Sequence, residues 1–422
     1  MHRLVQDNKD YCERKYGTDF TLVMMCGMFL IFGINTILNY AILVLFLIGC
    51  VKLMNEDALE LVCFPLYFFD YVLVLDKGIT FHLVYEFVFL FWLFVFRKNA
   101  VMKKQIFWFS ILFLAQVLVA KFSISYLVSA SLNIMVLALA YSRIVEKKQY
   151  DRLLRTISIA GVFASLYAVT RLNFEYGFRL LGTMTDPNFS AYLYVLGIVA
   201  TITCNLYTNK MKIFLTCLMA VTLLLTGSQT GIMATLIIIL FISYQRKPSK
   251  SFLAIGGLLI FIWFFLTVNL SNIQIIGKLQ NRVFESISAL RIGDYDSLTS
   301  YRFTISQRYF DSFIHNTGIF SKLFGGIDSS KDVFINMAGL PFMSILSHNS
   351  YIDMLFGVGI VGTVIIVVSI VHLSMKGLKI YKHTGDETYL GLASLKIVMA
   401  IFAMFLSFFA TKPFNFIYLL LF

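Results

Sequence analysis

Long apolar segments separated by short polar connections recur along almost the whole chain. Most approach the roughly 20 residues that an α-helix needs to cross the hydrocarbon core of a bilayer. They lack the alternation of apolar and polar positions that a membrane β-barrel requires. The pattern therefore predicts an all-α polytopic membrane protein with about 12 to 14 transmembrane helices. The predicted spans are residues 20–34, 38–53, 58–75, 79–96, 105–120, 124–141, 156–171, 189–206, 211–226, 230–245, 251–270, 349–374 and 391–411.

Two segments leave the number of spans open. Residues 20–53 are apolar almost throughout, so they form either one long helix or a tight hairpin. The sequence Gly33-Ile34-Asn35-Thr36 is typical of a turn, and we therefore expect the hairpin. Residues 413–422 are apolar but short, and whether they return into the membrane stays open.

A polar stretch at residues 271–347 interrupts the series of spans. It is too long for a simple connection, and loops of this size usually carry function or fold into a cap. Helical patterns at about 277–290 and 299–316 predict one large external loop folded as a helical cap, with Ser297 or Thr299 as the N-cap of the second helix. The aromatic residues of that helix face either the membrane or the bundle; they are Phe303, Phe310 and Phe313.

These patterns divide the chain into four parts. They are a cytoplasmic tail (1–19), a bundle of transmembrane helices (20–270), a large extracytoplasmic loop (271–347) and C-terminal transmembrane helices (348–422).

Composition supports a membrane protein and changes how the charge is interpreted. Of 422 residues, 59% are hydrophobic and 14% charged, which is too apolar for a soluble chain of this length. A formal charge of +12 would suggest nucleic acid as the partner of a soluble protein. In a membrane protein, lysine and arginine anchor the cytoplasmic ends of helices, and no nucleic-acid partner is expected.

The basic residues also orient the chain. If the N-terminus lies inside, lysines and arginines concentrate in the connections of the inner side, as the positive-inside rule requires. The basic connector 143–155 is then expected to lie along the inner leaflet. The large loop lies outside. Apart from this loop, the outer connections carry only Lys77, Lys121, Arg171, Arg179 and Lys412.

Four polar clusters fall on the predicted outer face. They are residues 178–190, residues 225–231, the loop with Arg282, Arg291, Arg302, Arg308 and Phe324-Gly325-Gly326, and the segment from Ser347 to Gly362 with His348. Each also fits a simpler role, as a turn, a helix start, a site for lipid headgroups or a helix cap. Together they outline one external site.

Other ionisable residues have weaker interpretations. Asp70, His82 and Glu86 lie within predicted spans, where charge is costly, and we expect them to face the bundle interior. Simple hydrogen bonding is favoured over a proton relay. Asp294-Tyr295-Asp296 is similar to the DxD motif that holds a metal in many soluble glycosyltransferases, but such pairs are common by chance, and no metal is expected.

The order of the polar clusters resembles the O-antigen polymerase and O-antigen ligase family of bacterial envelope glycosyltransferases. The resemblance covers roughly residues 175–365, and the N-terminal half is similar only in hydropathy. The motifs that carry it are Arg179-x-x-Gly182 with Asp186-Pro187-Asn188, then Thr226-Gly227-Ser228-Gln229-Thr230-Gly231, then the loop with Arg302 and Gly325-Gly326, then His348-Asn349-Ser350-Tyr351 before Gly357-x-Gly359-x-x-Gly362.

The resemblance implies a metal-independent membrane glycosyltransferase without a cofactor. Its partners would be an undecaprenyl-diphosphate-linked glycan, membrane lipids, and a chain-length regulator and flippase, at the outer face of the bacterial cytoplasmic membrane. His348 would be catalytic, and Arg302, Arg179, Arg308 and Arg171 would bind the diphosphate. The residues expected to line the site are Asp186, Asn188, Ser228, Gln229, Gly325, Gly326, Asn349 and Tyr351.

One departure from the family pattern favours a polymerase of oligosaccharide repeat units. Many relatives, ligases above all, carry Ser-Arg where this chain has Ser228-Gln229. A ligase that transfers finished glycan to another lipid or protein stays an alternative. A transporter of lipid-linked sugar is a third alternative, supported by the ionisable residues within predicted spans.

Overall fold

The computed structural model describes residues 18–56, 58–69, 71–75, 80–96, 147–175, 179–248, 274–294, 301–327, 329, 333 and 346–407. These residues are almost entirely helical, and the named strands are two short ones, β1 (Phe174–Glu175) and β2 (Arg179–Leu180), which pair antiparallel. The prediction of an all-α membrane protein is confirmed. The predicted spans 105–120, 124–141 and 251–270, and the segment 413–422, lie outside the described residues.

Three of the described helices are long and apolar enough to cross a membrane. They are Thr36–Asn55, Tyr150–Arg171 and Ser350–Thr384. The chain divides into two compact units, each described by itself below. The first comprises Met1–Ala100 and Arg143–Thr226, and the second comprises Val101–Ser142 and Gly227–Phe422.

The first unit begins with the predicted helical hairpin. One helix spans Thr18–Leu30, and α2 spans Thr36–Asn55. Between them, Gly33 takes a left-handed φ of 85°, and Asn35 caps α2 by accepting a bond from the Leu38 N–H over 2.8 Å. Glycine and asparagine are suited to these two roles, which is why this turn could be predicted.

The predicted span 58–75 is wrong. A 3₁₀ turn (η1, Leu59–Val62) leads into the seven-residue helix α3 (Cys63–Phe69), all of whose residues are buried. The chain then turns, and α4 begins at Phe81 and ends at Phe96. A short apolar run indicates burial but does not distinguish a membrane span from a helix buried among its neighbours.

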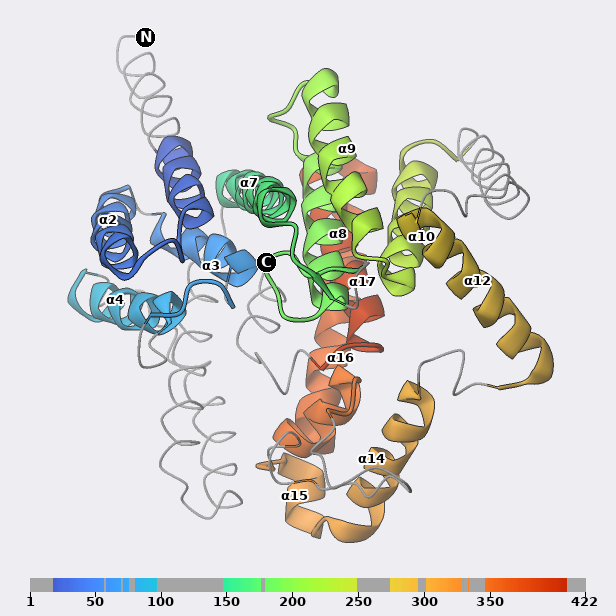
Figure 1. Ribbon diagram of the computed structural model, residues 1–422. Coiled ribbons are helices and arrows are strands. Elements are labelled where there is room, and N and C mark those ends of the chain that lie inside the picture. Colours follow the sequence, from blue (N-terminus) through green and yellow to red (C-terminus); the bar gives the residue numbers. More distant parts are fainter. Residues whose placement is uncertain are drawn as a thin grey trace. The chain divides into compact units, whose positions relative to one another are not determined.

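Three helices form the centre of the first unit: α7 (Lys147–Arg171), α8 (Pro187–Thr203) and α9 (Asn209–Leu225), shown in green in Figure 1. A Cβ atom added at Gly161 would lie 3.0 Å from the Gly197 Cα, so small residues let α7 and α8 approach closely. The predicted connector 143–155 needs correction, because from Lys147 onward it is the first part of α7.

The second unit contains α10 (Gln229–Arg246), α12 (Gln274–Ile292), α14 (Arg302–Asn316), α15 (Ile319–Phe324), α16 (Ser350–Thr384) and α17 (Glu387–Ala403). The two predicted loop helices are α12 and α14, whereas α15 was not expected. Neither Ser297 nor Thr299 caps α14: its N-cap is Tyr301, in a left-handed conformation and without a side-chain cap. The predicted caps lie too early because the helix begins at Arg302.

The helix α16 is longer than the predicted span 349–374 and is interrupted. Gly359 has φ 71° and ψ −177°, which no helical residue adopts, so a kink separates a short first part from a long second part. The long part packs against α17, and an ion pair of 2.6 Å between Arg246 and Glu387 joins α10 to α17. The helix α17 both begins and ends earlier than the predicted span 391–411.

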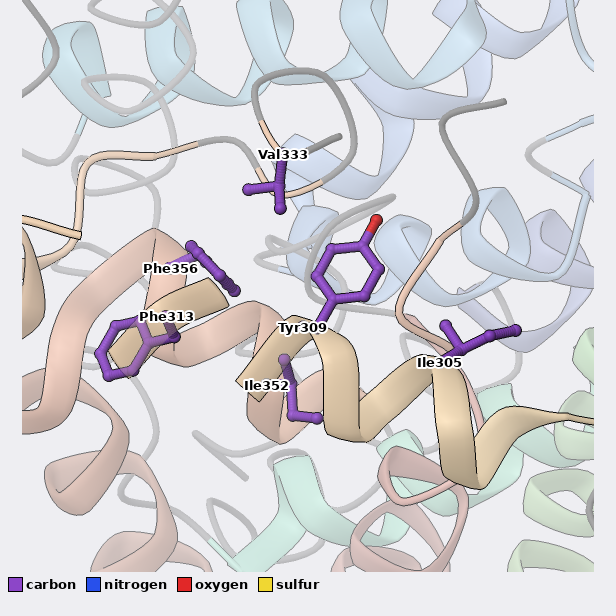
Figure 2. Packing of buried hydrophobic residues seen from close by; sticks show 6 residues of the cluster. All are labelled: Ile305, Tyr309, Phe313, Val333, Ile352 and Phe356. Carbon is purple, nitrogen blue, oxygen red and sulfur yellow. The ribbon is translucent and has the colours of Figure 1, made fainter. Parts of the chain in front are cut away.

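A small hydrophobic core attaches α14 to the first part of α16 (Figure 2). Its members are Ile305, Tyr309, Phe313, Val333, Ile352 and Phe356. The rings of Phe313 and Phe356 meet edge to face with centroids 5.3 Å apart, a favourable geometry for aromatic pairs. Phe313 is 4% exposed, whereas Phe303 and Phe310 are 55% and 45% exposed, so only Phe313 faces this core.

Candidate functional site

His348 lies in the turn that precedes α16. Its φ of 52° is in the left-handed region, which residues with a side chain rarely adopt. The next residue, Asn349, caps the helix: its Oδ1 accepts bonds from the Tyr351 N–H over 3.0 Å and the Ile352 N–H over 3.3 Å. The imidazole is therefore attached to a backbone turn that the start of α16 holds in place.

A second set of contacts joins this turn to α14. The Ser306 Oγ donates to the carbonyl of Ser347, the residue before His348, over 3.2 Å. Arg302 precedes Ser306 by about one helical turn and therefore lies on the same side of α14. The helix thus directs Arg302 toward the segment that carries the histidine.

Residues 405–407, after the end of α17, contact both sides of this arrangement. Arg302 donates from Nη1 to the carbonyl of Phe405 over 3.1 Å, and Ser350 donates from Oγ to the carbonyl of Leu406 over 2.5 Å. Because these two carbonyls are adjacent, Arg302 and the His348 turn meet at one corner of the second unit. Three chain segments thus converge there: α14 with Arg302, the turn that carries His348, and residues 405–406.

The two glycines after α15 attach the cap to the kink of α16. Gly325 and Gly326 have φ of 77° and 94°, and the N–H of Gly326 donates to the Gly357 carbonyl over 3.0 Å. The next N–H, of Ile327, donates to the Phe356 carbonyl over 3.1 Å. A Cβ at Gly325 would collide with Gly357, and one at Gly359 would collide with the Leu323 carbonyl. These glycines act through backbone contact rather than by lining an open site.

Tyr351 contacts α17, and Arg308 lies further along α14 than Arg302. The Tyr351 hydroxyl donates to the Ala400 carbonyl of α17 over 3.0 Å. Arg308 follows Arg302 by six residues, which turns it by about 120° around α14. The helix therefore does not present Arg302 and Arg308 on one face.

Ser228 and Gln229 start α10 in the same unit. Ser228 is the N-cap, and its Oγ accepts a bond from the Gly231 N–H over 3.2 Å. The Gln229 Nε2 donates to the Ser286 Oγ of α12 over 3.2 Å. Gln229 thus connects the start of α10 to the first helix of the cap.

The other predicted site residues belong to the first unit. Arg179, on β2, donates from Nε to the Thr226 carbonyl over 3.2 Å and from Nη2 to the Asn188 Oδ1 over 3.0 Å. Asp186 is the N-cap of α8 and accepts a bond from the Asn188 N–H over 2.6 Å. The Asp-Pro-Asn motif therefore both starts the helix and fixes the guanidinium of Arg179.

Arg171 ends α7 and has structural contacts. Its Nη2 donates to the Phe32 carbonyl over 3.2 Å, and its guanidinium lies 5.5 Å from the centroid of the Tyr167 ring. These contacts tie the end of α7 to the turn of the N-terminal hairpin.

Two polar residues of the corner, Ser306 and Ser407, were not predicted, whereas Ser347 begins the fourth predicted cluster. Ser306, Ser347 and Ser407 connect α14, the His348 turn and the segment after α17; the Oγ atoms of Ser347 and Ser407 are 3.1 Å apart. The spacing of Ser306 from Arg302 was a usable signal, because residues four apart share a helix face. Nothing in the sequence pointed to Ser407.

Tyr309 belongs to the small hydrophobic core that joins α14 to α16, and its neutral hydroxyl faces the polar residue Ser329. Burial, with the nearby Asp353 as a smaller cause, raises the pKa of Tyr309 to about 12. Its hydroxyl thus keeps its proton at physiological pH and points toward the Ser329 carbonyl at 3.5 Å. Within the described ranges, no three His, Cys, Asp or Glu side chains are grouped as metal ligands would be.

Comparison with known proteins identifies one segment of the chain. Residues 214–367 match a family model described as O-antigen ligase (Wzy_C). The segment begins in α9, includes the cap helices and ends in α16, so it contains Arg302, the two cap glycines and His348. The resemblance drawn from the sequence motifs is confirmed. No curated protein matches the chain.

Proposed function

We propose that this chain, which carries the O-antigen ligase family segment at residues 214–367, is a polysaccharide polymerase. It would join undecaprenyl-diphosphate-linked oligosaccharide repeat units into O-antigen or capsule at the outer face of the bacterial cytoplasmic membrane. The match to this family supports a glycan-transferring membrane enzyme. The observation that carries the proposed chemistry is the corner of the second unit where Arg302 and the His348 turn share residues 405–406 as partners.

Transfer at this face draws its energy from the bond between the sugar and the diphosphate. Negative charge develops on the departing undecaprenyl diphosphate as that bond breaks, and a cation there lowers the barrier. Arginine suits the role because it stays charged and its planar donors match phosphate oxygens. We assign Arg302 to this task, with its guanidinium oriented by the Phe405 carbonyl.

The second requirement is a group that takes a proton from the acceptor. A hydroxyl of one glycan attacks the anomeric carbon of the other, forming the new glycosidic bond as the bond to diphosphate breaks. Histidine changes charge near neutral pH and accepts such a proton without a metal. We assign this proton transfer to His348.

The positive-inside rule supports an external position of the cap, where lipid-linked repeat units are available. Membrane lipids, a chain-length regulator and a flippase are the partners that a polymerase of this kind would need. Gln229 supports polymerase over ligase, because it replaces the arginine that ligase-type relatives carry in this turn and it bonds to Ser286 of the cap.

Deleting the gene and analysing the surface glycan tests the proposal. A polymerase predicts single repeat units in place of long polymer, with transfer to the final acceptor intact. Long polymer that stays on undecaprenyl diphosphate would instead identify a ligase. Purified protein with lipid-linked repeat units separates the third class, because a transporter would move the substrate without forming a new bond.

A further inference from the structure

A buried carboxylate lies close to the His348 turn and is not used by the proposed chemistry. Asp353 is 2% exposed, in the first turn of α16. Burying a carboxylate is unfavourable unless hydrogen-bond donors face it. Two serine hydroxyls do so here: the Ser347 Oγ donates to Oδ1 over 2.7 Å, and the Ser329 Oγ donates to the same oxygen over 2.8 Å.

Ser347 has a single hydroxyl proton, so its contacts must be divided into donated and accepted bonds. The contact with Asp353 is shorter than the 3.0 Å contact with the Asn349 carbonyl, and bonds to a charged acceptor are the stronger ones. The proton therefore points to the carboxylate. The same Oγ then accepts from the Asn349 N–H over 3.0 Å and from the Ser407 hydroxyl over 3.1 Å. The direction of the Ser347 side chain is set by Asp353.

His348 lies directly between two residues of this network. Its left-handed φ of 52° is a conformation that persists only when the surroundings over-determine it. On one side, Ser347 is held by Asp353 through its hydroxyl and by Ser306 through its carbonyl. On the other side, Asn349 is held by its cap bonds to α16.

We propose that Asp353 is a positioning residue for His348. Its carboxylate fixes Ser347, and so the backbone turn that carries His348, and it joins this turn to the cap through Ser329. Ser347 in turn contacts Ser407, in the segment after α17. The proposal rests on the role of His348 under the proposed function. The cap and the turn that carries His348 are thereby linked through one buried carboxyl group.

The test uses purified full-length enzyme with lipid-linked repeat units. Displacing a catalytic group by about 1 Å costs on the order of 100-fold in rate. We expect kcat to fall roughly 100-fold for Asp353→Ala and roughly tenfold for Asp353→Asn, which keeps the shape, with KM changed by less than about threefold in each. Ser347→Ala should resemble Asp353→Asn, and Ser347→Thr, which keeps the hydroxyl, should retain activity. Ser369→Ala is the matched control, because Ser369 bonds only to its own helix, at the Ile365 carbonyl.

Combining each change with His348→Ala separates positioning from a general role in folding. If Asp353 acts through His348, adding Asp353→Asn to His348→Ala lowers the residual rate no further. The proposal would be overturned if Asp353→Asn lowered the rate by the same factor in the wild-type enzyme and in His348→Ala. It would also be overturned if Asp353→Asn kept the wild-type kcat while His348→Ala was inactive. Full activity of His348→Ala would instead remove the proposed role of His348 itself. If Asp353→Asn does not fold, Ser347→Ala and Ser347→Thr carry the same comparison.

Discussion

At the residue scale, His348 combines a reactive side chain with an unfavourable backbone conformation. Its φ of 52° is costly for any residue with a Cβ atom and costs nothing for glycine. The position therefore retains a side chain at the expense of stability, which is typical of functional sites.

Replacing His348 tests both parts of this argument. We expect His348→Ala and His348→Gly to abolish long polymer, because both lack the proton acceptor. His348→Gly should also unfold at a higher temperature than His348→Ala, by the equivalent of about 1 kcal/mol, because only glycine relieves the backbone. Gel analysis of the polymer and thermal melting of the purified proteins measure the two effects. Normal polymer length in either variant would contradict the assignment.

Arg302 should respond to the geometry of its replacement as well as to its charge. Lysine keeps the charge but loses the planar donors, so we expect Arg302→Lys to retain a minor part of the activity and Arg302→Glu to retain none. The control is Lys379→Glu, a charge reversal at an exposed position of α16 far along the helix from His348. Turnover of lipid-linked repeat units measures all three variants. Equal losses in Arg302→Glu and the control would indicate a general effect of charge on folding.

At the element scale, the contact between the end of α15 and the kink of α16 holds the cap beside the histidine. Backbone meets backbone there, because the N–H groups of Gly326 and Ile327 bond to carbonyls of α16 at the kink. The sequence motif Gly325-Gly326 could be recognised, but its partner could not. Any residue can offer its backbone carbonyl, so such a contact requires only the glycine that permits close approach and leaves no other sequence pattern.

A glycine substitution distinguishes this contact from an ordinary loop. We expect Gly325→Ala to destabilise the protein by about 1–3 kcal/mol and to reduce polymer formation, because its φ is 77° and a Cβ would collide with Gly357. The matched control is Gly318→Ala, since nothing lies within 4 Å of a Cβ added there. Thermal melting compares the two. The contact is unimportant if both variants melt at the wild-type temperature.

Some elements could be predicted from local sequence patterns and others could not. The hairpin between the first two helices was predicted because a glycine and a capping asparagine lie at its turn. The segment 58–75 was misassigned as one span because it forms a 3₁₀ turn and a buried helix of seven residues. The helix α15 was missed because it has only six residues and none of them is buried, so its sequence shows no periodic pattern.

At the scale of the whole molecule, the predicted orientation has a direct test. Gln307 on α14 and Lys379 on α16 are both exposed, and the positive-inside rule assigns them to opposite sides of the membrane. In a cysteine-free background, we expect Gln307→Cys to react with an impermeant thiol reagent in spheroplasts, and Lys379→Cys to react only after permeabilisation. Labelling of both in intact spheroplasts, or of Lys379→Cys alone, would reverse or abolish the proposed topology.

The sequence by itself determined that this is a helical membrane protein with a segment similar to the O-antigen ligase family, and it singled out Arg302 and His348. Composition, span length and local motifs suffice for this, because they reflect the solvent around each segment and chemistry confined to a few neighbouring residues. Only the tertiary structure decided that α14, the His348 turn and residues 405–407 converge, and that the buried Asp353 bonds to Ser347 in this turn. Such contacts join residues far apart in the chain, and they depend on the phase of one helix against another, which no local pattern specifies.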